Sequence, residues 1–386
     1  MRGGYVDNNK QMLNDLLSNT LQGKPAPWLD NSVEFEDLFL ETSFNHDVQP
    51  LLYHFLNKTP EWLTWPERVR EAIIQETQFQ SVQTLLKKAE LERLLEALDQ
   101  KNIPAILMKG MPLSYQIYPR PHLRPSLDID LFIQKKDLGA VKEIMTKFDY
   151  TPVNSVEGDF VSHQHTFVKE DGHGIKHAYD FHWRISNPAV FSDSLTFAEA
   201  DQNASGVPGL GKHARSLCLE HALLLACIHR VAHHRHNERL IWLYDIRLLV
   251  KKMSAEQIRS FLRFANAKRV RSVCYQGLSL SRQWFGTSLP EAELHAFENQ
   301  NGEAEPSAVY LRSEKGGIRR NFMLNWKTLP SLKDKTRFLL ETVFPSPDYM
   351  LKKYSTRSRV LLPILYARRG CAGLLKFLRR TSFRTQ

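Results

Sequence analysis

The chain of 386 residues is poor in cysteine and has no long apolar run. Its four cysteines lie far apart and form no C-x-x-C pair, which disfavours a disulfide framework or a cysteine zinc site and fits a reducing compartment. The longest apolar stretches, Ala222–Ile228 and Val360–Ala367, fall well short of the roughly 20 residues that span a bilayer. The first residues are polar and lack the apolar segment of a signal peptide. These absences predict a cytoplasmic protein without a transmembrane segment.

Basic residues outnumber acidic residues in the chain. The chain has 52 Lys and Arg against 42 Asp and Glu, a formal net charge of +10 and a pI of about 9.3. Such a balance suits anionic partners such as nucleotides, nucleic acid, a phosphorylated substrate or an acidic membrane face, although a merely solvated basic surface fits it equally well. Much of the excess lies near the C-terminus, at Lys352, Lys353, Arg357, Arg359, Arg368, Arg369, Lys376, Arg379, Arg380 and Arg384.

Hydrophobic periodicity predicts helices at both ends and strands in the middle. Pro66 begins a long helical run, Glu67–Gln100, whose leucines from Leu85 to Leu98 recur near helical spacing and are expected to form core packing or a helix–helix contact. Four strands are predicted, at Ile103–Met108, Leu127–Ile133, Phe160–Val168 and His177–Ile185. We therefore expect an α+β fold with four parts: an N-terminal helical segment (1–100), a core with a small mixed β-sheet (101–200), a helical domain (201–300) and a basic C-terminal helical extension (301–386).

Two carboxylates stand two residues apart on one predicted strand, at Asp128 and Asp130. The period-2 geometry of a strand points both to the same face, while Leu127, Ile129 and Leu131 point to the core. Carboxylates this close repel each other unless a cation neutralises them, and Mg²⁺ takes such ligands together with substrate phosphates. The pair predicts a metal clamp, although a lone D-x-D also occurs at solvated strand ends.

Neighbouring residues strengthen that prediction. Lys109-Gly110 ends the preceding strand and begins a helix, where free backbone N–H groups can bind phosphate. Arg120 and Arg124 follow in the next loop and can pair with phosphate oxygens. A third acid, Asp180, lies on a later strand in YDFHWRI, where it shares one face with the two further polar residues His182 and Arg184.

The run LMKGMPLSYQIYPRPHLRPSLDIDLFI, with YDFHWRI some fifty residues later, resembles the DNA polymerase β-like nucleotidyltransferase superfamily. More narrowly, it resembles a bacterial nucleotidyltransferase family with a K-G…Y…R…D-I-D-L core and a later D-x-H-W. The resemblance covers the central 80 or so residues best and extends to WLYDIRLL (Trp242–Leu249) and to Phe344–Tyr354. It implies transfer of a nucleoside monophosphate from a nucleoside triphosphate to a hydroxyl acceptor, in polysaccharide biosynthesis or peptide tailoring.

The resemblance also implies roles for residues. Asp128 and Asp130 would hold two Mg²⁺ or Mn²⁺ ions, and Asp180 would complete the site and orient the acceptor hydroxyl. Gly110 would let the backbone approach the triphosphate, and Lys109 and Arg124 would bind phosphate. His182 and Arg184 would lie on the acceptor side. The wider superfamily has Gly-Ser where Lys109-Gly110 stands here, so either the lysine replaces the missing hydroxyl or the site does not support catalysis.

Histidines are the remaining polar clusters. His229 and His233 have the i,i+4 spacing of a zinc pair, but arginines crowd the stretch up to His236, so a basic wall or a solvated helix end is favoured over zinc. Arg230 and His236 also have an R-x5-H spacing seen in some helical RNases, a short and common pattern. The four histidines near the predicted hairpin are interpreted as surface loop residues or as lining of the acceptor cleft: His163, His165, His173 and His177. Asp245 is interpreted as a helix-packing acid paired with an arginine.

Two alternatives to an active nucleotidyltransferase stay open. The first is a non-catalytic protein that keeps the fold and binds a nucleotide or serves as a scaffold. The second is an RNA- or DNA-modifying nucleotidyltransferase. The charge permits a nucleic-acid partner, but no aromatic–basic RNA-binding signature favours it.

Overall fold

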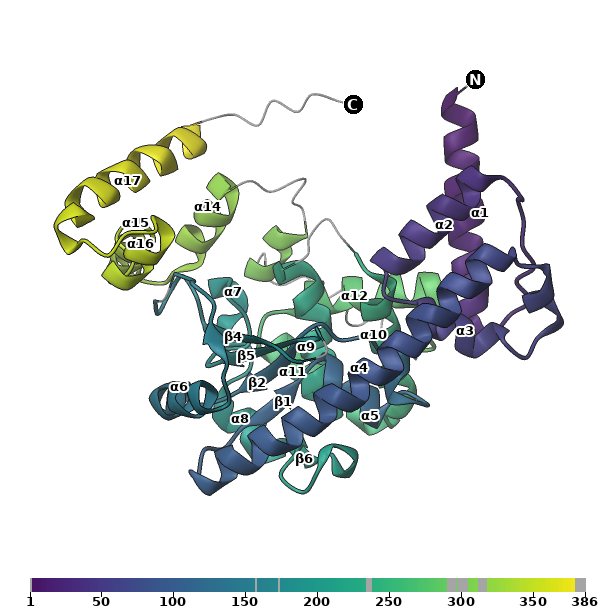
Figure 1. Cartoon of the computed structure of the whole chain (residues 1–386), viewed down its shortest axis with the longest axis horizontal. Coiled ribbons are helices and arrows are strands. Elements are labelled where there is room, and N and C mark those ends of the chain that lie inside the picture. Colours follow the sequence, from purple (N-terminus) through teal and green to yellow (C-terminus); the bar gives the residue numbers. More distant parts are fainter. Residues whose placement is uncertain are drawn as a thin grey trace.

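The computed structural model of the chain describes residues 2–156, 158–172, 174–233, 238–289, 297, 305–311 and 318–378. A mixed seven-stranded sheet lies at the centre, with the N-terminal helices at one end of the molecule and the C-terminal helices at the other (Figure 1). The predicted α+β architecture is confirmed. Within the described residues, no helix is both long and apolar enough to cross a membrane.

The N-terminal helices surround a cluster of aromatic rings. Their bounds are α1 Arg2–Gln22, α2 Val33–Asn45, α3 Gln49–Leu56, η1 Pro60–Thr64 and α4 Glu67–Gln100. Trp28, Phe39 and Trp65 pack with ring centroids 5.1–5.2 Å apart, a spacing typical of favourable aromatic pairs. Helix α4 begins directly after Pro66, as predicted. One leucine of this run differs from the prediction: Leu85 is exposed, because it lies on the side of α4 opposite to buried Lys87.

The sheet has the strand order β3-β4-β5-β2-β1-β7-β6. Its strands are β1 Ile106–Met108, β2 Ile129–Phe132, β3 Thr151–Pro152, β4 Gln164–Glu170, β5 Lys176–His182, β6 Ser205–Gly206 and β7 Arg215–Ser216. Strand β2 is antiparallel to β1 and parallel to β5, while β4 and β5 form the predicted hairpin. The polar residues of β2 and β5 therefore lie side by side on adjacent strands.

Alternation along the strands divides the core between the two faces of the sheet. Leu107, Ile129 and Leu131 pack with helix α6 (Leu138–Lys147) and the C-terminal half of α4. Ile106 and Phe132 face the opposite way and join a larger cluster with the helices that follow the sheet. Asp130 lies between Ile129 and Leu131 and so points to this second face. The acidic residues of the sheet thus face the helical part of the chain.

Four helices lie on this side of the sheet, with α11 and α12 packed against α9: α9 Leu219–His233, α10 Leu240–Lys252, α11 Ala255–Ala267 and α12 Arg271–Phe285. The last ends at Gly286, which adopts the left-handed conformation (φ 63°) that favours glycine at a helix end. The same buried cluster includes residues of α1–α3, so the N-terminal helices and α9–α12 share one core. Short elements connect the sheet to these helices: α5 Gly110–Gln116, η2 Pro121–Leu123, η3 Lys135–Asp137, α7 Ala189–Ser192, α8 Phe197–Asn203 and η4 Pro208–Leu210.

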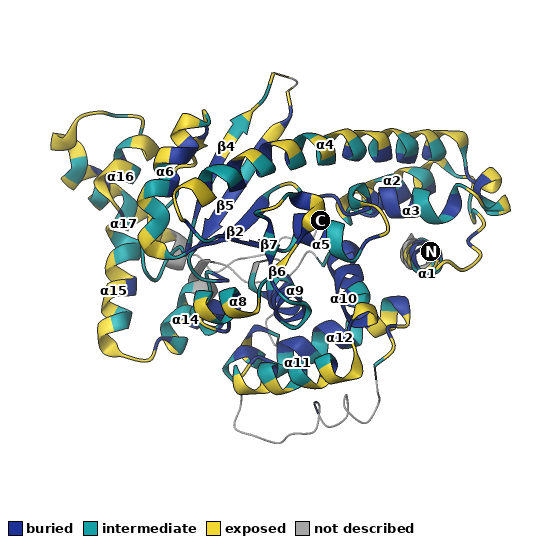
Figure 2. Ribbon diagram, turned by 90° about the horizontal axis from the view of Figure 1, so that it is seen from below, coloured by how far each residue is buried: buried dark blue, intermediate teal, exposed yellow. Residues whose placement is uncertain are grey.

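The C-terminal helices form one edge of the molecule (Figure 2). Their bounds are η5 Pro306–Tyr310, α14 Ile318–Thr328, α15 Leu332–Val343, α16 Pro347–Lys353, η6 Arg359–Leu361 and α17 Leu362–Leu378. Residues 290–296, 298–304 and 312–317 lie outside the described residues, as does the end of the basic tail beyond Leu378.

Candidate active site

The turn between β1 and α5 brings the backbone and a lysine to the acidic face of the sheet. Lys109 has φ 51°, a conformation that non-glycine residues rarely adopt and that is often found at functional sites. Gly110 follows, and a Cβ at this position would collide with the hydroxyl of Ser126. The Ser126 Oγ donates to the carbonyl of Asp128 at 2.7 Å. A serine hydroxyl therefore lies against the turn, supplied by the loop before β2 rather than by the turn itself.

The D-x-D pair lies at the start of β2. Asp130 is buried within the strand, whereas Asp128 is half-buried and precedes it. Ile129 and Leu131 are buried in the core as predicted, but Leu127 is 70% exposed. The prediction for Leu127 is wrong because the strand begins at Ile129, so strict alternation does not reach back to residue 127. Leu127 instead lies at the rim of a pocket.

The register of β2 and β5 places Asp180 directly beside Asp130. Oxygen or nitrogen atoms of Asp130, Asp180 and His182 lie within 4.8 Å of one another. Asp180 accepts hydrogen bonds from Thr166 Oγ1 at 2.5 Å and from Gln164 Nε2 at 2.9 Å, both on the neighbouring strand β4. These bonds fix the direction of the Asp180 carboxylate.

Two nitrogen atoms meet at one oxygen of Asp130. Lys109 Nζ and His182 Nε2 each lie 2.8 Å from Asp130 Oδ1. Burial alone would raise the pKa of Asp130, but these two neighbours hold the pKa of that carboxyl well below its usual range. Likewise, burial alone would lower the pKa of Lys109, but the charges of Asp130 and Asp128 raise it. Lys109 and Asp130 therefore form a charged pair.

The charge of Lys109 compensates Asp128 only in part. The charge of Asp130, followed by burial, raises the pKa of Asp128 to about 6. The pKa values of Asp128 and Asp130 therefore shift in opposite directions, which indicates that the positive charges nearby do not neutralise both carboxylates.

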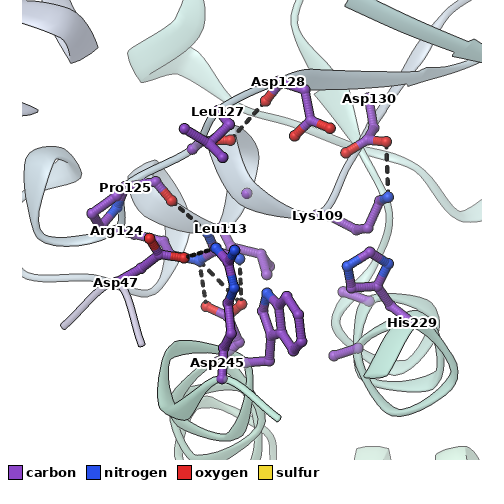
Figure 3. A pocket seen from close by; sticks show the side chains of 16 residues that line it. Asp47, Lys109, Leu113, Arg124, Pro125, Leu127, Asp128, Asp130, His229 and Asp245 are labelled. Atoms are coloured by element: carbon purple, nitrogen blue, oxygen red, sulfur yellow. Dashed lines mark hydrogen bonds and ion pairs between the residues drawn. The ribbon is translucent and has the colours of Figure 1, made fainter. Parts of the chain in front are cut away.

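Asp128 and Asp130 point into a pocket between the sheet and helices α9 and α10 (Figure 3). Lys109 lies between Asp130 and His229, and the opposite side of the pocket is formed by Arg124, Asp245 and Asp47 (Figure 3). The remaining lining is Gly110, Leu113, Pro125, Ser126, Leu127, Ala222, Ala226, Arg239 and Trp242. The pocket thus has an acidic end on the sheet and a mixed-charge wall on the helices.

Arg124 is held by Asp245. Its Nε and Nη2 atoms lie 2.8–3.1 Å from the Asp245 carboxylate, which also accepts from the Tyr118 hydroxyl at 2.6 Å. Asp245 is therefore a packing acid paired with an arginine, as predicted. Arg124 lines the pocket, but its guanidinium is engaged by this carboxylate rather than directed freely at a ligand. A second pair, Arg239 with Asp47, lines the same wall.

The two other predicted arginines lie away from the pocket. Arg120 is exposed at the start of η2, and Arg184 pairs with Asp193 at 3.1 Å beyond the end of β5. Neither lines the pocket. Arg184 lies beyond the end of β5 at His182, so the period-2 alternation of the strand does not direct its side chain.

The histidines divide into three groups. The interpretation of the hairpin histidines as surface residues is wrong for His163, His165 and His177, which are all buried, and His173 lies outside the described residues. His229 lines the pocket, with its ring 5.3 Å from that of Trp242. The zinc and R-x5-H hypotheses involve the His233 side chain and residues 234–236, which lie outside the described part of the chain. Arg230 is buried and bound to Glu238, away from the pocket lining.

The acidic cluster fits a divalent cation. It offers carboxylate oxygens of Asp130 and Asp180 and an imidazole nitrogen within one small volume, with Asp128 adjacent. Oxygen ligands suit Mg²⁺ and Mn²⁺, and the imidazole is compatible with Mn²⁺. The raised pKa of Asp128 is a further sign, because it reports excess negative charge in the cluster.

A family of proteins described as uncharacterised nucleotidyltransferases matches residues 34–286, which include the sheet, the acidic cluster and helices α9–α12. The chain belongs to this nucleotidyltransferase family. Among solved structures, it is similar to the antibiotic-resistance factor ANT(2'')-Ia, with 19% identity over 50% of this chain and 95% of that chain and a TM-score of 0.34, a likeness too loose to support further argument. No curated protein matches the chain.

Several residues that line the pocket of this nucleotidyltransferase are not predicted from the sequence. Asp47, Trp242 and Ser126 all line the pocket. Ser126 and Trp242 lie in segments that carry the family resemblance but received no role, and no motif marks Asp47. Lys87 of α4 donates to the carbonyl of Ser126 from outside the pocket, and burial lowers the pKa of its amine to about 8. The sequence offers one signal for Lys87: it is a charged residue within the leucine-rich run of α4, where the pattern predicts apolar residues.

Proposed function

We propose that this protein transfers a nucleoside monophosphate from a nucleoside triphosphate to a hydroxyl acceptor in the pocket between the sheet and helices α9 and α10. Support comes chiefly from one observation: Asp180, some fifty residues later in the chain, lies beside the Asp128–Asp130 pair and the Lys109-Gly110 turn. In this proposal the three carboxylates hold two Mg²⁺ or Mn²⁺ ions. When bound, these ions would neutralise phosphate charge and polarise the reacting oxygens.

The residues of the pocket would bind and orient the triphosphate. The Lys109 ammonium, now 2.8 Å from Asp130, would move to the phosphates and free the Asp130 oxygen for a cation. Gly110 would let the backbone N–H groups approach the phosphates. The nucleoside would lie toward Trp242 and His229 on the helical wall, where an aromatic surface can contact a base.

Asp180 would orient the acceptor. Its carboxylate is held in place by Thr166 and Gln164, and each oxygen retains capacity for another hydrogen bond. The acceptor oxygen would form a bond to the α-phosphorus while the bond from that phosphorus to pyrophosphate breaks, and the hydroxyl proton would pass to the Asp180 carboxylate. Most of the acceleration would come from positioning and charge stabilisation.

Label transfer from each nucleoside triphosphate, carrying ³²P at the α-position, tests this proposal. The protein is incubated with Mg²⁺ or Mn²⁺ and with separated glycan, lipid, peptide and nucleic-acid fractions of a bacterial extract. We expect labelling of one fraction by the wild type, loss by Asp130→Asn, and retention by Asp15→Asn, which makes the same change on the exposed surface of α1.

Each outcome separates the alternatives. Transfer that survives Asp130→Asn contradicts the site. Nucleotide binding without transfer to any fraction favours the non-catalytic alternative. Labelling confined to the nucleic-acid fraction favours an RNA- or DNA-modifying enzyme.

A further inference from the structure

The net positive charge of the chain is concentrated in its last 55 residues. Residues 332–386 contain 13 Lys and Arg but only 3 Asp and Glu, a surplus equal to the +10 of the entire chain. The 331 residues before them, including the pocket, therefore carry balanced charge. Most of this basic segment is described as α15, α16, η6 and α17, at one edge of the molecule (Figures 1 and 2).

One side of helix α17 packs against α14, α15 and α16. Leu365 is buried, the Tyr366 hydroxyl donates to the carbonyl of Pro345 at 2.6 Å, and Arg369 donates to the carbonyl of Thr342 at 3.1 Å. These contacts bind the helix to α15 and to the start of α16.

The other side of α17 is apolar and exposed. Ile364, Cys371 and Leu375 recur at intervals of seven and four residues, which places them along one face of α17, and Val360 lies in η6 directly before the helix. Val360 is 85% exposed, Ile364 66% and Leu375 59%. We name these four residues the apolar stripe. Arg357 and Arg359 precede it, and Arg368 lies on the same face of α17 between Ile364 and Cys371.

We infer that the apolar stripe and its flanking arginines bind the surface of an anionic lipid bilayer. Helices that lie in a membrane interface combine an exposed aliphatic face with Lys and Arg, and acidic headgroups attract such basic residues. A second copy of the chain is a poorer occupant, because two surfaces with the same large positive charge would repel each other. Nucleic acid would use the arginines but leave three aliphatic side chains without a role, since bases stack on aromatic rings.

The lipid-binding edge is connected to the sheet. Glu341 of α15 accepts from the backbone N–H of Phe160 at 2.8 Å, and Arg337 lies 2.9 Å from Asp159. This loop leads into β4, which carries Gln164 and Thr166 beside Asp180. A protein docked through α17 would therefore present its pocket in one orientation relative to the bilayer.

Vesicle flotation combined with a fluorescent probe tests this inference. Cys371 is exposed, Cys227 and Cys274 are buried, and Cys218 is half-buried, so an environment-sensitive nitrobenzoxadiazole probe can be attached to Cys371 in a Cys218→Ser background. We expect flotation and a blue shift of the probe with phosphatidylglycerol-containing vesicles, and neither with pure phosphatidylcholine. The double substitution Ile364→Glu and Leu375→Glu is expected to weaken binding at least about tenfold.

Leu63→Glu is the matched control, because it places the same acid at an exposed apolar site of η1. It should leave flotation unchanged. Three results would overturn the inference. The first is flotation that high salt abolishes and that brings no blue shift of the probe. The others are tighter binding to RNA than to vesicles, and a dimer that the double substitution dissociates. Asp130→Asn should float like the wild type, so failure of the proposed transfer reaction and failure of lipid binding are separable.

Discussion

Lys109 Nζ and Asp130 Oδ1 are 2.8 Å apart, so the turn after β1 supplies a positive charge to the acidic residues of β2. Because this pair is buried, removing one partner leaves the other uncompensated. Lys109→Met should lower the free energy of unfolding by about 3 kcal/mol in metal-free protein. Urea denaturation measures this, and Mn²⁺ should restore part of the loss by replacing the missing charge. The exposed substitution Lys251→Met serves as control, and an equal loss in both variants would contradict the pairing.

The raised pKa of Asp128 predicts opposite responses of stability and metal binding to pH. Since the folded protein holds the Asp128 proton up to about pH 6 and the unfolded chain only to about pH 4, metal-free protein should lose stability as pH rises through this window. The contribution is at most about 3 kcal/mol and should vanish in Asp128→Asn. Mn²⁺ affinity should fall below about pH 6, where the proton competes. Calorimetric titration across pH 5–7 checks this, and a flat affinity would refute the assignment of Asp128 as a ligand.

Close packing of Gly110 against Ser126 predicts a compensating pair of substitutions. Gly110→Ala should destabilise the protein by about 1–3 kcal/mol, because the new Cβ collides with the Ser126 hydroxyl. Ser126→Gly removes that hydroxyl and should restore most of the loss in the double variant. Thermal unfolding of the four proteins completes the cycle. If the two substitutions lower the free energy of unfolding additively, the contact with Ser126 is not the reason that residue 110 is glycine.

The burial of the Arg124–Asp245 ion pair predicts that the pair stabilises the fold more than an exposed ion pair does. Asp245→Asn should cost about 3–5 kcal/mol, because it leaves the buried Arg124 charge uncompensated. Asp201→Asn is the control: it breaks the half-exposed pair with Arg215 and should cost less than about 1 kcal/mol. Denaturant midpoints compare the two, and similar costs would contradict the burial argument.

Local patterns in the sequence predicted much of the framework. The helix after Pro66, the β1–α5 turn at Lys109-Gly110, the alternation of Asp130 with buried Ile129 and Leu131, and the β4–β5 hairpin all follow from periods of 3.6 and 2 and from residues that begin or end elements. The ends of the strands are predicted less accurately, and so are the directions of side chains just beyond those ends. Leu127 and Arg184 each lie just outside a strand, where the strand period no longer directs the side chain.

By itself, the sequence determined that two acids stand two residues apart at the start of one strand and that a lysine and a glycine end the preceding one. Only the tertiary structure decided what that face meets. The parallel register of β2 and β5 sets Asp180 beside Asp130, the turn aims Lys109 at the same carboxylate, and Asp245 of a distant helix takes Arg124. Such contacts join residues more than 50 positions apart in some cases, and they depend on how elements pack rather than on the neighbours of each residue in the chain.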